Sequence, residues 1–163
     1  MENNINQAYF AGGCFWGVEY YFQNLAGVMA TKTGYMGGHK DSPTYQEVCG
    51  KNTGHAETLE ITYDEAKVNY ENLAKLFFEI HDPAQKNRQG PDIGNQYRSA
   101  IFYADKEQKD IAEKLIKQLK LKGFKVATEV TKAGTFWPAE DYHQQYHTKN
   151  GQQPYCHVRV KRF

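Results

Sequence analysis

Apolar side chains recur along this chain at spacings that predict strands alternating with helices. Residues 6–11 predict a short strand. Val18, Phe22 and Leu25 then fall at helical spacing. Gly27 is placed to end that helix as a C-terminal cap. The chain therefore begins with a strand that leads almost directly into a helix.

A regular alternation of polarity at residues 55–63 predicts another strand. Period two places three apolar side chains on one face, namely Leu59, Ile61 and Tyr63. Glu57 lies on the same face, near the start of the strand. Because this face must be buried, we expect the Glu57 carboxyl in a poorly solvated position.

The remaining elements follow from the same rules, with Gly, Pro and capping residues at their ends. In chain order they are a short strand running into a glycine-rich loop at 31–45, a helix from the N-cap Asn69 to about His81, a second loop at 84–95, a central strand at 96–103, a helix between Asp105 and Gly123, a strand at 124–131, and a short helix from Pro138 to about Lys149. This order predicts an α+β fold with a mixed sheet, and a crossover pair of the ferredoxin-like kind fits it.

Composition bounds the function more than it identifies it. The 163 residues are enough for one domain with a real core. The 20 basic and 19 acidic side chains nearly cancel, which gives no electrostatic case for nucleic acid or an anionic membrane as partner. No apolar run approaches the roughly 20 residues of a membrane span. We expect a single catalytic domain over residues 1–163, with a flexible C-terminal tail from about residue 150.

The N-terminus and the cysteines predict a cytoplasmic protein. The first four residues, Met-Glu-Asn-Asn, lack the basic and apolar regions of a secretory signal. Three cysteines at scattered spacings do not form a disulfide framework.

Cys14 is the leading candidate for a nucleophile. It lies in Gly12-Gly13-Cys14-Phe15-Trp16-Gly17, where the first predicted strand turns into a helix. Free backbone N–H groups and the helix dipole favour an anion at such a position. We therefore expect a lowered pKa for Cys14, since the thiolate is the reactive form. The alternative is a buried cysteine in an aromatic core.

Glu57 is the candidate proton donor. A carboxyl on a buried strand face has a raised pKa and can be protonated near neutral pH, as a general acid requires. The alternative is that Glu57 lies at a frayed strand end in water, or pairs with an Arg. A thiolate and a proton donor together suit a reaction in which the thiolate attacks one atom while the donor protonates an oxygen bonded to that atom.

Three other readings compete with this one. His143 and His147, four residues apart, could bind a metal together with Cys49, His55, Cys156 or His157, but the chain contains no Cys-x-x-Cys. We therefore expect no metal site, and take the two histidines as anchors of the last helix. A cysteine hydrolase would need a histidine beside Cys14. A binding module with an incidental cysteine leaves the clustered glycines unexplained.

Seven short motifs follow one another from the first strand almost to the C-terminus. They are Gly13-Cys14-Phe15-Trp16-Gly17, Thr33-Gly34-Tyr35-x-Gly37-Gly38, Pro43-Thr44-Tyr45, Thr53-Gly54-His55-Ala56-Glu57, His81-Asp82-Pro83, Gln96-Tyr97-Arg98-Ser99 and Ala139-Glu140-Asp141-Tyr142-His143-Gln144. Together they resemble the peptide-methionine (S)-S-oxide reductases, the A-type methionine sulfoxide reductases. The resemblance implies a two-layer α/β plait and reduction of the S epimer of methionine sulfoxide, free or in proteins.

The resemblance also implies a role for each matching residue. Cys14 attacks the sulfoxide sulfur and Glu57 protonates the oxygen. Tyr45 and Tyr97 donate hydrogen bonds to that oxygen, and Asp92 holds the polar network.

The apolar side of the site comes from the first motif. Gly13, Phe15 and Trp16 line the pocket for the S-methyl group. No metal or organic cofactor is implied. We expect a monomer that has neither nucleic acid nor a membrane as partner.

The same resemblance implies that Cys14 ends as a sulfenic acid, that a second cysteine condenses with it, and that thioredoxin or another thiol reduces the disulfide. Cys156 aligns with a resolving cysteine of the family, although the residues around it differ from the usual glycine-rich tail. Cys49 lies in a segment that predicts a packed position. We therefore expect Cys156 to resolve the sulfenic acid.

Overall fold

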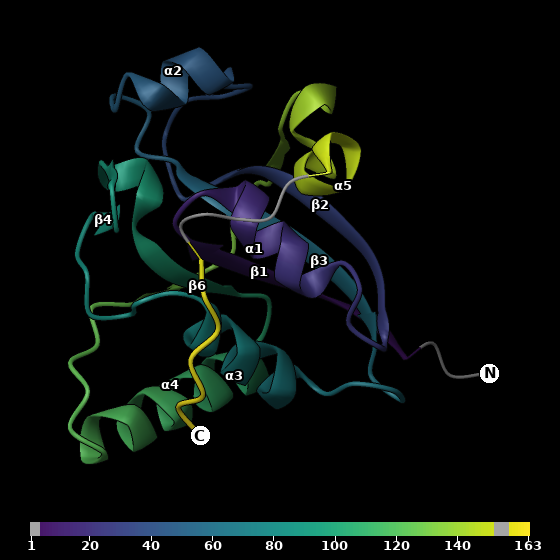
Figure 1. Cartoon of the computed structure of the whole chain (residues 1–163), viewed down its shortest axis with the longest axis vertical. Helices are drawn as coiled ribbons and strands as arrows, with labels where there is room; N and C mark the ends of the chain where they lie inside the picture. The colour runs from purple at the N-terminus through teal and green to yellow at the C-terminus, as the bar shows by residue number, and fades with distance from the viewer. Residues whose placement is uncertain (1–3, 152–156) are drawn as a thin grey trace.

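Within residues 4–151 and 157–163, which the computed structural model describes, a six-stranded sheet forms the centre of the protein. Its strand order is β7-β6-β1-β3-β2-β8 (Figure 1). The strands are β1 (Ile5–Gly12), β2 (Val28–Met36), β3 (Ala56–Asp64), β6 (Ser99–Tyr103), β7 (Glu129–Lys132) and β8 (Trp137–Pro138). Neighbouring strands are antiparallel except β6 and β7, which are parallel. The predicted α+β class and mixed sheet are confirmed.

Two helices make the main connections between the central strands. Helix α1 (Phe15–Phe22) leads from β1 to β2, and α3 (Tyr70–Ile80) leaves β3 on the way to β6. Between α3 and β6 lie a small hairpin of β4 (Arg88–Gln89) and β5 (Asp92–Ile93) and the 3-10 helix η1 (Asn95–Tyr97). The antiparallel register brings the end of β1, the end of β2 and the starts of β3 and β6 to the same end of the sheet.

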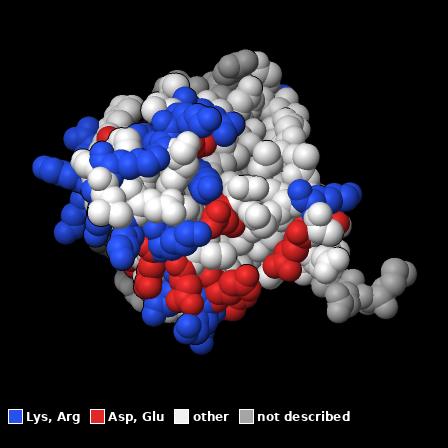
Figure 2. Space-filling view, turned by 90° about the horizontal axis from the view of Figure 1, so that it is seen from below, with Lys and Arg blue, Asp and Glu red and all other residues white. Residues whose placement is uncertain are grey.

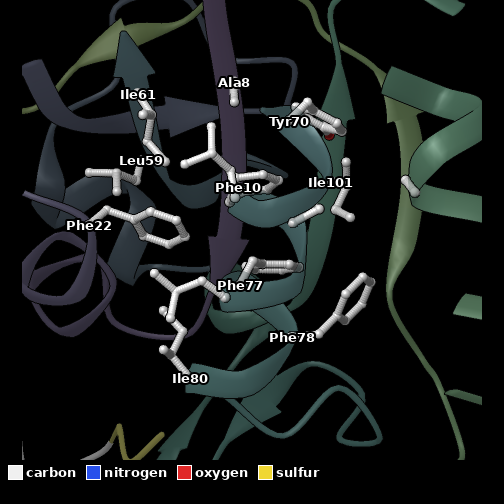
Figure 3. Close-up of a cluster of buried hydrophobic side chains, with 14 of the residues drawn as sticks. Ala8, Phe10, Phe22, Leu59, Ile61, Tyr70, Phe77, Phe78, Ile80 and Ile101 are labelled. Atoms are coloured by element: carbon white, nitrogen blue, oxygen red, sulfur yellow. The ribbon is translucent and has the colours of Figure 1, made fainter. Parts of the chain in front are cut away.

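The main core lies between the sheet and the helices α1, α3 and α4 (Lys106–Leu121). Aromatic rings fill its centre. Phe10 of β1 stacks on Phe77 of α3, with ring centroids 4.9 Å apart, and on Phe22 of α1 at 5.7 Å (Figure 3). Burial of each such ring contributes about 1.5–3 kcal/mol. This packing fixes α1, and with it the residue that precedes α1, against the sheet.

The predicted helix starts at Asn69 and Asp105 are confirmed. The Asn69 side chain accepts a hydrogen bond from the Asn72 N–H, and that of Asp105 accepts one from the Gln108 N–H. These contacts satisfy N–H groups that the first turn of a helix leaves open.

Several predicted boundaries in the first half of the chain are wrong. Helix α1 ends at Phe22, and Gly27, with a φ of 94°, lies in the turn beyond it. The segment predicted at 31–45 begins inside β2, which already starts at Val28. It ends at the unpredicted short helix α2 (Tyr45–Cys49), which begins with a reciprocal capping box between Thr44 and Glu47.

Other differences lie near the ends of the later elements. Residues 96–97 belong to η1, so the strand that follows begins only at Ser99. The strand predicted at 124–131 is the shorter β7. Pro138 starts no helix: it lies in β8 at the edge of the sheet, where a residue without an N–H is tolerated. The last helix is divided into η2 (Asp141–His143) and α5 (Tyr146–Asn150).

The end of the chain makes contacts that the sequence did not predict. Residues 157–163 run beside α3 and α4 (Figure 1). The buried Glu79 of α3 accepts hydrogen bonds from the Arg159 guanidinium, at 3.0 Å, and from the Arg162 N–H, also at 3.0 Å. Phe163 packs against the main core. An ion pair with one buried partner and a terminal aromatic ring thus hold this described part of the tail.

Charged side chains of both signs cover the face formed by α3, α4 and the C-terminus. Figure 2 shows Lys and Arg gathered on one side of this face and Asp and Glu beside them. No helix among the described residues combines the length and the apolar character that a membrane crossing needs.

Candidate active site

Cys14 lies at the junction of β1 and α1, as the sequence predicted. It is the N-cap residue of α1, and its side chain is 8% exposed. Gly13 makes the turn with a φ of 91°, a conformation that favours glycine. A Cβ on Gly13 would also lie 2.7 Å from the Gln89 side chain, so the close approach of the β4 hairpin excludes any other residue there.

Glu57 faces the start of α1 from the neighbouring strand. In the antiparallel pair of β1 and β3, Phe10 lies opposite Leu59. Two residues further along β1, the same register places Gly12 opposite Glu57. Glu57 is 1% exposed, so its predicted burial is confirmed. The Phe15 N–H donates a hydrogen bond of 3.2 Å to Oε1 of Glu57. The carboxyl therefore lies beside the first turn of the helix that Cys14 caps.

Two tyrosines from separate elements share this environment. Tyr45 opens α2 and Tyr97 ends η1. Burial, followed by the negative charge of Glu57, raises the pKa of both phenols above the usual value. Both hydroxyls therefore stay protonated at neutral pH and can donate hydrogen bonds. The charge of Asp92, in β5, also raises the pKa of Tyr97, so Asp92 lies within electrostatic reach of it.

Phe15 forms one wall of the site. Its side chain is 1% exposed, and its ring centroid lies 5.8 Å from that of Tyr35 and 6.4 Å from that of Tyr45. Val48 and Ala139 belong to the same apolar cluster. The cluster joins α1, α2 and β2 into one surface beside Cys14.

Trp16 forms a second, half-buried wall. Its ring lies flat on Tyr146, with centroids 3.8 Å apart and an interplanar angle of 8°. Its Nε1 donates a hydrogen bond of 2.9 Å to Nδ1 of the buried His143. Stacking on one ring and hydrogen bonding to another fix the orientation of the indole.

Sequence reasoning missed the role of His143 and of Glu140. Both belong to one of the quoted motifs, but neither was assigned to the site. His143 lies in η2, before the last helix α5, and supports Trp16. Glu140 accepts hydrogen bonds from the Tyr35 hydroxyl and the Tyr45 N–H, each at 3.0 Å. Burial favours a higher pKa for Glu140, but these bonds outweigh it and the pKa lies below the usual value.

His157 was also missed, because nothing in the sequence pattern links it to the first motif. Its Nε2 lies 2.7 Å from the carbonyl oxygen of Gly12 and donates to it, since a carbonyl can only accept. The ring packs on Gly17, where a Cβ would collide with the imidazole. His157 therefore supports the turn that carries Cys14.

Of the two other cysteines, the structure describes Cys49 alone. Cys49, at the end of α2, is partly exposed and not in a disulfide. Burial raises the pKa of the Cys49 thiol, and this effect is larger than the opposite effect of a hydrogen bond with Tyr45. Cys156 lies outside the described residues, so its role as the resolving cysteine stays a prediction.

His55, one of the candidate metal ligands, has ordinary structural partners. His55 accepts a hydrogen bond from the Gly38 N–H at Nδ1 and donates from Nε2 to the Lys40 carbonyl oxygen. Across residues 4–151 and 157–163, no three His, Cys, Asp or Glu side chains gather as metal ligands do.

Comparison with known proteins adds relatives to this geometry. The family model described as "Peptide methionine sulfoxide reductase" matches residues 6–163. A peptide methionine sulfoxide reductase MsrA from Nautilia profundicola is 52% identical over 150 residues, which cover 92% of this chain and 87% of that protein.

Solved structures agree with these matches. The reduced form of Mxr1 from Saccharomyces cerevisiae superposes with a TM-score of 0.88 at 35% identity, covering 98% of this chain and 93% of that one. Mxr1 in complex with Trx2 shares the fold, with a TM-score of 0.64 at 22% identity over 96% of this chain and 90% of that one.

These matches favour the reductase over the hydrolase and the binding module that the sequence left open. The predicted resemblance is confirmed by a family model that spans nearly the whole chain. The protein is therefore an enzyme of the peptide methionine sulfoxide reductase family, of the MsrA type.

Proposed function

We propose that this protein reduces the S epimer of methionine sulfoxide, free or in proteins, to methionine with electrons from a thiol. The observation that carries the proposal is the hydrogen bond from the Phe15 N–H to Oε1 of Glu57. It places a buried carboxyl beside the helix start that Cys14 caps. A sulfur nucleophile and a proton donor at one point match the two ends of a sulfoxide group.

The reaction begins with attack of the Cys14 sulfur on the sulfoxide sulfur. Glu57 transfers a proton to the sulfoxide oxygen, while Tyr45 and Tyr97 donate hydrogen bonds to it and Asp92 holds the polar network. The oxygen then passes to Cys14: the transient S–S bond and the S–O bond of the substrate break, an S–O bond forms on the Cys14 sulfur, and methionine leaves with Cys14 as a sulfenic acid. Two electrons have then passed from the cysteine to the substrate.

The apolar surface beside Cys14 supports a place for the methyl group. Phe15 and Trp16 offer ring faces there, and Gly13 makes the turn that brings both residues beside Cys14. The hydrogen-bond donors, the hydroxyls of Tyr45 and Tyr97, belong to α2 and η1, whereas Phe15 and Trp16 belong to α1. A site with such distinct apolar and polar sides discriminates between the two epimers of a chiral sulfur.

Recycling requires a second thiol. Cys156 attacks the sulfenic sulfur, water leaves, and the resulting disulfide is reduced by the dithiol of thioredoxin or another thiol reductant. The yeast relative Mxr1 has been solved in complex with Trx2, which supports a thioredoxin as partner. No metal or organic cofactor enters this scheme.

We further infer a single catalytic domain over residues 1–163 that acts as a monomer in the cytoplasm. The strand order β6-β1-β3-β2, with α1 and α3 as crossovers, supports a two-layer plait with a ferredoxin-like core.

The decisive experiment is a thioredoxin-coupled assay on the separated S and R epimers, as free amino acid and in a peptide. We expect turnover of the S epimer and negligible turnover of the R epimer. Equal rates on both epimers, or none on either, would overturn the proposal. Ester or peptide cleavage without a reductant would point to the hydrolase instead.

A further inference from the structure

A second buried carboxylate lies in α1, and the proposed reaction does not use it. Glu19 is 1% exposed and lies almost one helical turn after Trp16. Its Oε1 accepts a hydrogen bond of 2.7 Å from the Gln145 N–H. Its Oε2 accepts bonds of 2.9 Å from the Gln145 side-chain Nε2 and from the Thr31 hydroxyl. Three donors thus replace the water that burial removes.

The electrostatics of Glu19 reflect the same arrangement. Burial raises its pKa, and the bonds from Thr31 and Gln145 act in the opposite direction. The charge of Lys149 on α5 also favours the carboxylate, but less than these bonds do. Gln145 therefore provides two of the three hydrogen-bond donors that hold Glu19.

Gln145 has an unusual backbone. Its φ of 54° and ψ of 39° are left-handed, a conformation that costs free energy for a residue with a Cβ. It is the residue immediately before α5, so its conformation sets the direction in which α5 starts. The two bonds from Gln145 to Glu19 offset this cost and hold the turn in place.

Residues on both sides of this turn fix Trp16. Before it, Nδ1 of His143 accepts the indole N–H, and the Gln144 amide bonds both the N–H and the carbonyl oxygen of Thr33, each at 2.9 Å. After it, Tyr146 stacks on the indole at 3.8 Å. Glu19 and Trp16 belong to the same helix, so α1 itself anchors the segment that clamps its own Trp16.

We propose that Glu19 is a positioning residue that, through Gln145, fixes the Trp16 wall of the substrate pocket. This inference rests on the proposed function, in which Trp16 contacts the S-methyl group. Glu57 is held separately, by the Phe15 N–H. Loss of the Glu19 contacts should therefore weaken substrate binding far more than it slows the chemical step.

The test exchanges donor and acceptor. In Glu19→Gln the charged acceptor is lost. The amide oxygen can still accept the backbone N–H at position 145, but the Gln145 side-chain amide must turn over to bond the new N–H group, and each bond then joins two neutral groups. In the double variant Glu19→Gln/Gln145→Glu the direction of the side-chain bond is reversed, and the backbone N–H at position 145 still has an oxygen acceptor. Thr31 can follow by rotating its hydroxyl.

Single-turnover kinetics on methionine S-sulfoxide separate binding from chemistry. We expect the dissociation constant of Glu19→Gln to rise about tenfold, as loss of a hydrogen bond to a charged group implies, with the saturating rate within about threefold of wild type. The double variant should recover most of this loss. An unchanged dissociation constant in Glu19→Gln, or no recovery in the double variant, would overturn the inference.

A readout independent of activity is the hydrogen exchange of the Trp16 indole N–H, observed by ¹H–¹⁵N spectroscopy. The chain has two tryptophans, and Trp137→Phe assigns the signal. We expect the Trp16 indole N–H to exchange faster in Glu19→Gln and to regain protection in the double variant. Unchanged protection in Glu19→Gln overturns the inference. If wild type reduces no methionine sulfoxide, the proposed function fails, and indole exchange still decides how Trp16 is held.

Gln23→Ala is the matched control. Its side chain donates an exposed hydrogen bond of 2.7 Å from the end of α1 to the Thr148 hydroxyl on α5. This variant loosens the same pair of helices without touching Gln145, so both readouts should stay near wild type. An equal effect of Gln23→Ala would show a general loosening of α5 and overturn the specific role of Glu19. Should Glu19→Gln fail to fold, Glu19→Asp, which keeps the charge on a shorter side chain, carries the same comparison.

Discussion

The backbone N–H of Phe15 donates a 3.2 Å hydrogen bond to Oε1 of Glu57, across 42 residues of sequence. This bond joins the first turn of α1 to the start of β3. It means that the carboxyl at the buried end of a strand and the cysteine that caps a helix belong to one site. The geometry of that site leads to the following tests.

Glu57→Gln should retain substrate binding and lose the transferable proton. The expected cost in the chemical step is roughly 10²–10⁴-fold, the usual contribution of a general acid. Rapid-quench measurement of methionine released in a single turnover checks this. Glu60→Gln, three residues along β3, serves as the control and should react at the wild-type rate. A Glu57→Gln rate within about threefold of wild type would assign Glu57 a purely structural role.

Cys14→Ser should abolish methionine release, even in a single turnover with excess substrate. A hydroxyl at the same position is a far weaker nucleophile than a thiolate. The fold should survive, because serine is close to cysteine in size and the Cys14 side chain makes no capping hydrogen bond to the first turn of α1. Circular dichroism verifies folding, and mass spectrometry of wild type after one turnover should find the oxidised sulfur on Cys14. Residual turnover in Cys14→Ser would assign the nucleophile elsewhere.

The choice of resolving thiol can be tested by comparing the other two cysteines. Cys156→Ser should release one methionine per enzyme and then stop, since no second thiol closes the disulfide that thioredoxin reduces. Cys49→Ser should recycle normally. Peptide mapping after one turnover identifies the bridge directly. A Cys14–Cys49 disulfide, or a lasting sulfenic acid with Cys156 still reduced, contradicts the assignment.

Gly17→Ala tests the support that His157 gives to the turn. The added methyl group collides with the imidazole, which must leave the Gly12 carbonyl or push α1 outward. Overpacking of this kind costs roughly 1–3 kcal/mol of the free energy of unfolding. Urea unfolding measures it. Gly134→Ala is the control, since a Cβ at Gly134 has no atom within 4 Å among the described residues. Equal stability of the two variants would show that His157 yields without cost.

His81 should make stability depend on pH. It is 3% exposed, and its ring lies between the Phe77 carbonyl oxygen and the Ser99 hydroxyl. Burial lowers its pKa to about 3. The unfolded state, with a pKa of about 6.5, therefore binds the proton first as the pH falls. The contribution of neutral His81 is present above pH ~6.5 and is lost toward pH 3, by on the order of 1 kcal/mol per pH unit.

Urea unfolding of wild type and His81→Gln at several pH values between 7 and 4 checks this slope. The variant starts less stable at pH 7, and its stability should fall less steeply on acidification. His39→Gln, at an exposed position, should retain the wild-type slope. Parallel slopes for wild type and His81→Gln would show that His81 titrates alike in both states.

Local patterns in the sequence were enough for much of the fold and for part of the site. Asn69 and Asp105 could be placed as helix caps because a cap bonds an N–H only a few residues away. Glu57 could be placed on a buried face because a strand alternates with period two. Cys14 could be placed at a helix start because the double glycine and the spacing of Val18 and Phe22 mark the junction.

Only the tertiary structure decided the contacts between segments that lie far apart in the chain. The bond from Trp16 to His143 spans 127 residues, and the bond from Gln145 to Glu19 spans 126. No periodicity links such residues, because each bond depends on how whole elements pack and on the direction of single side chains. The sequence by itself determined most of the elements and the positions of Cys14 and Glu57, the two groups that we propose react, since these follow from short-range hydrogen bonding and burial. The tertiary structure decided which side chains hold those groups in place, since that depends on long-range packing.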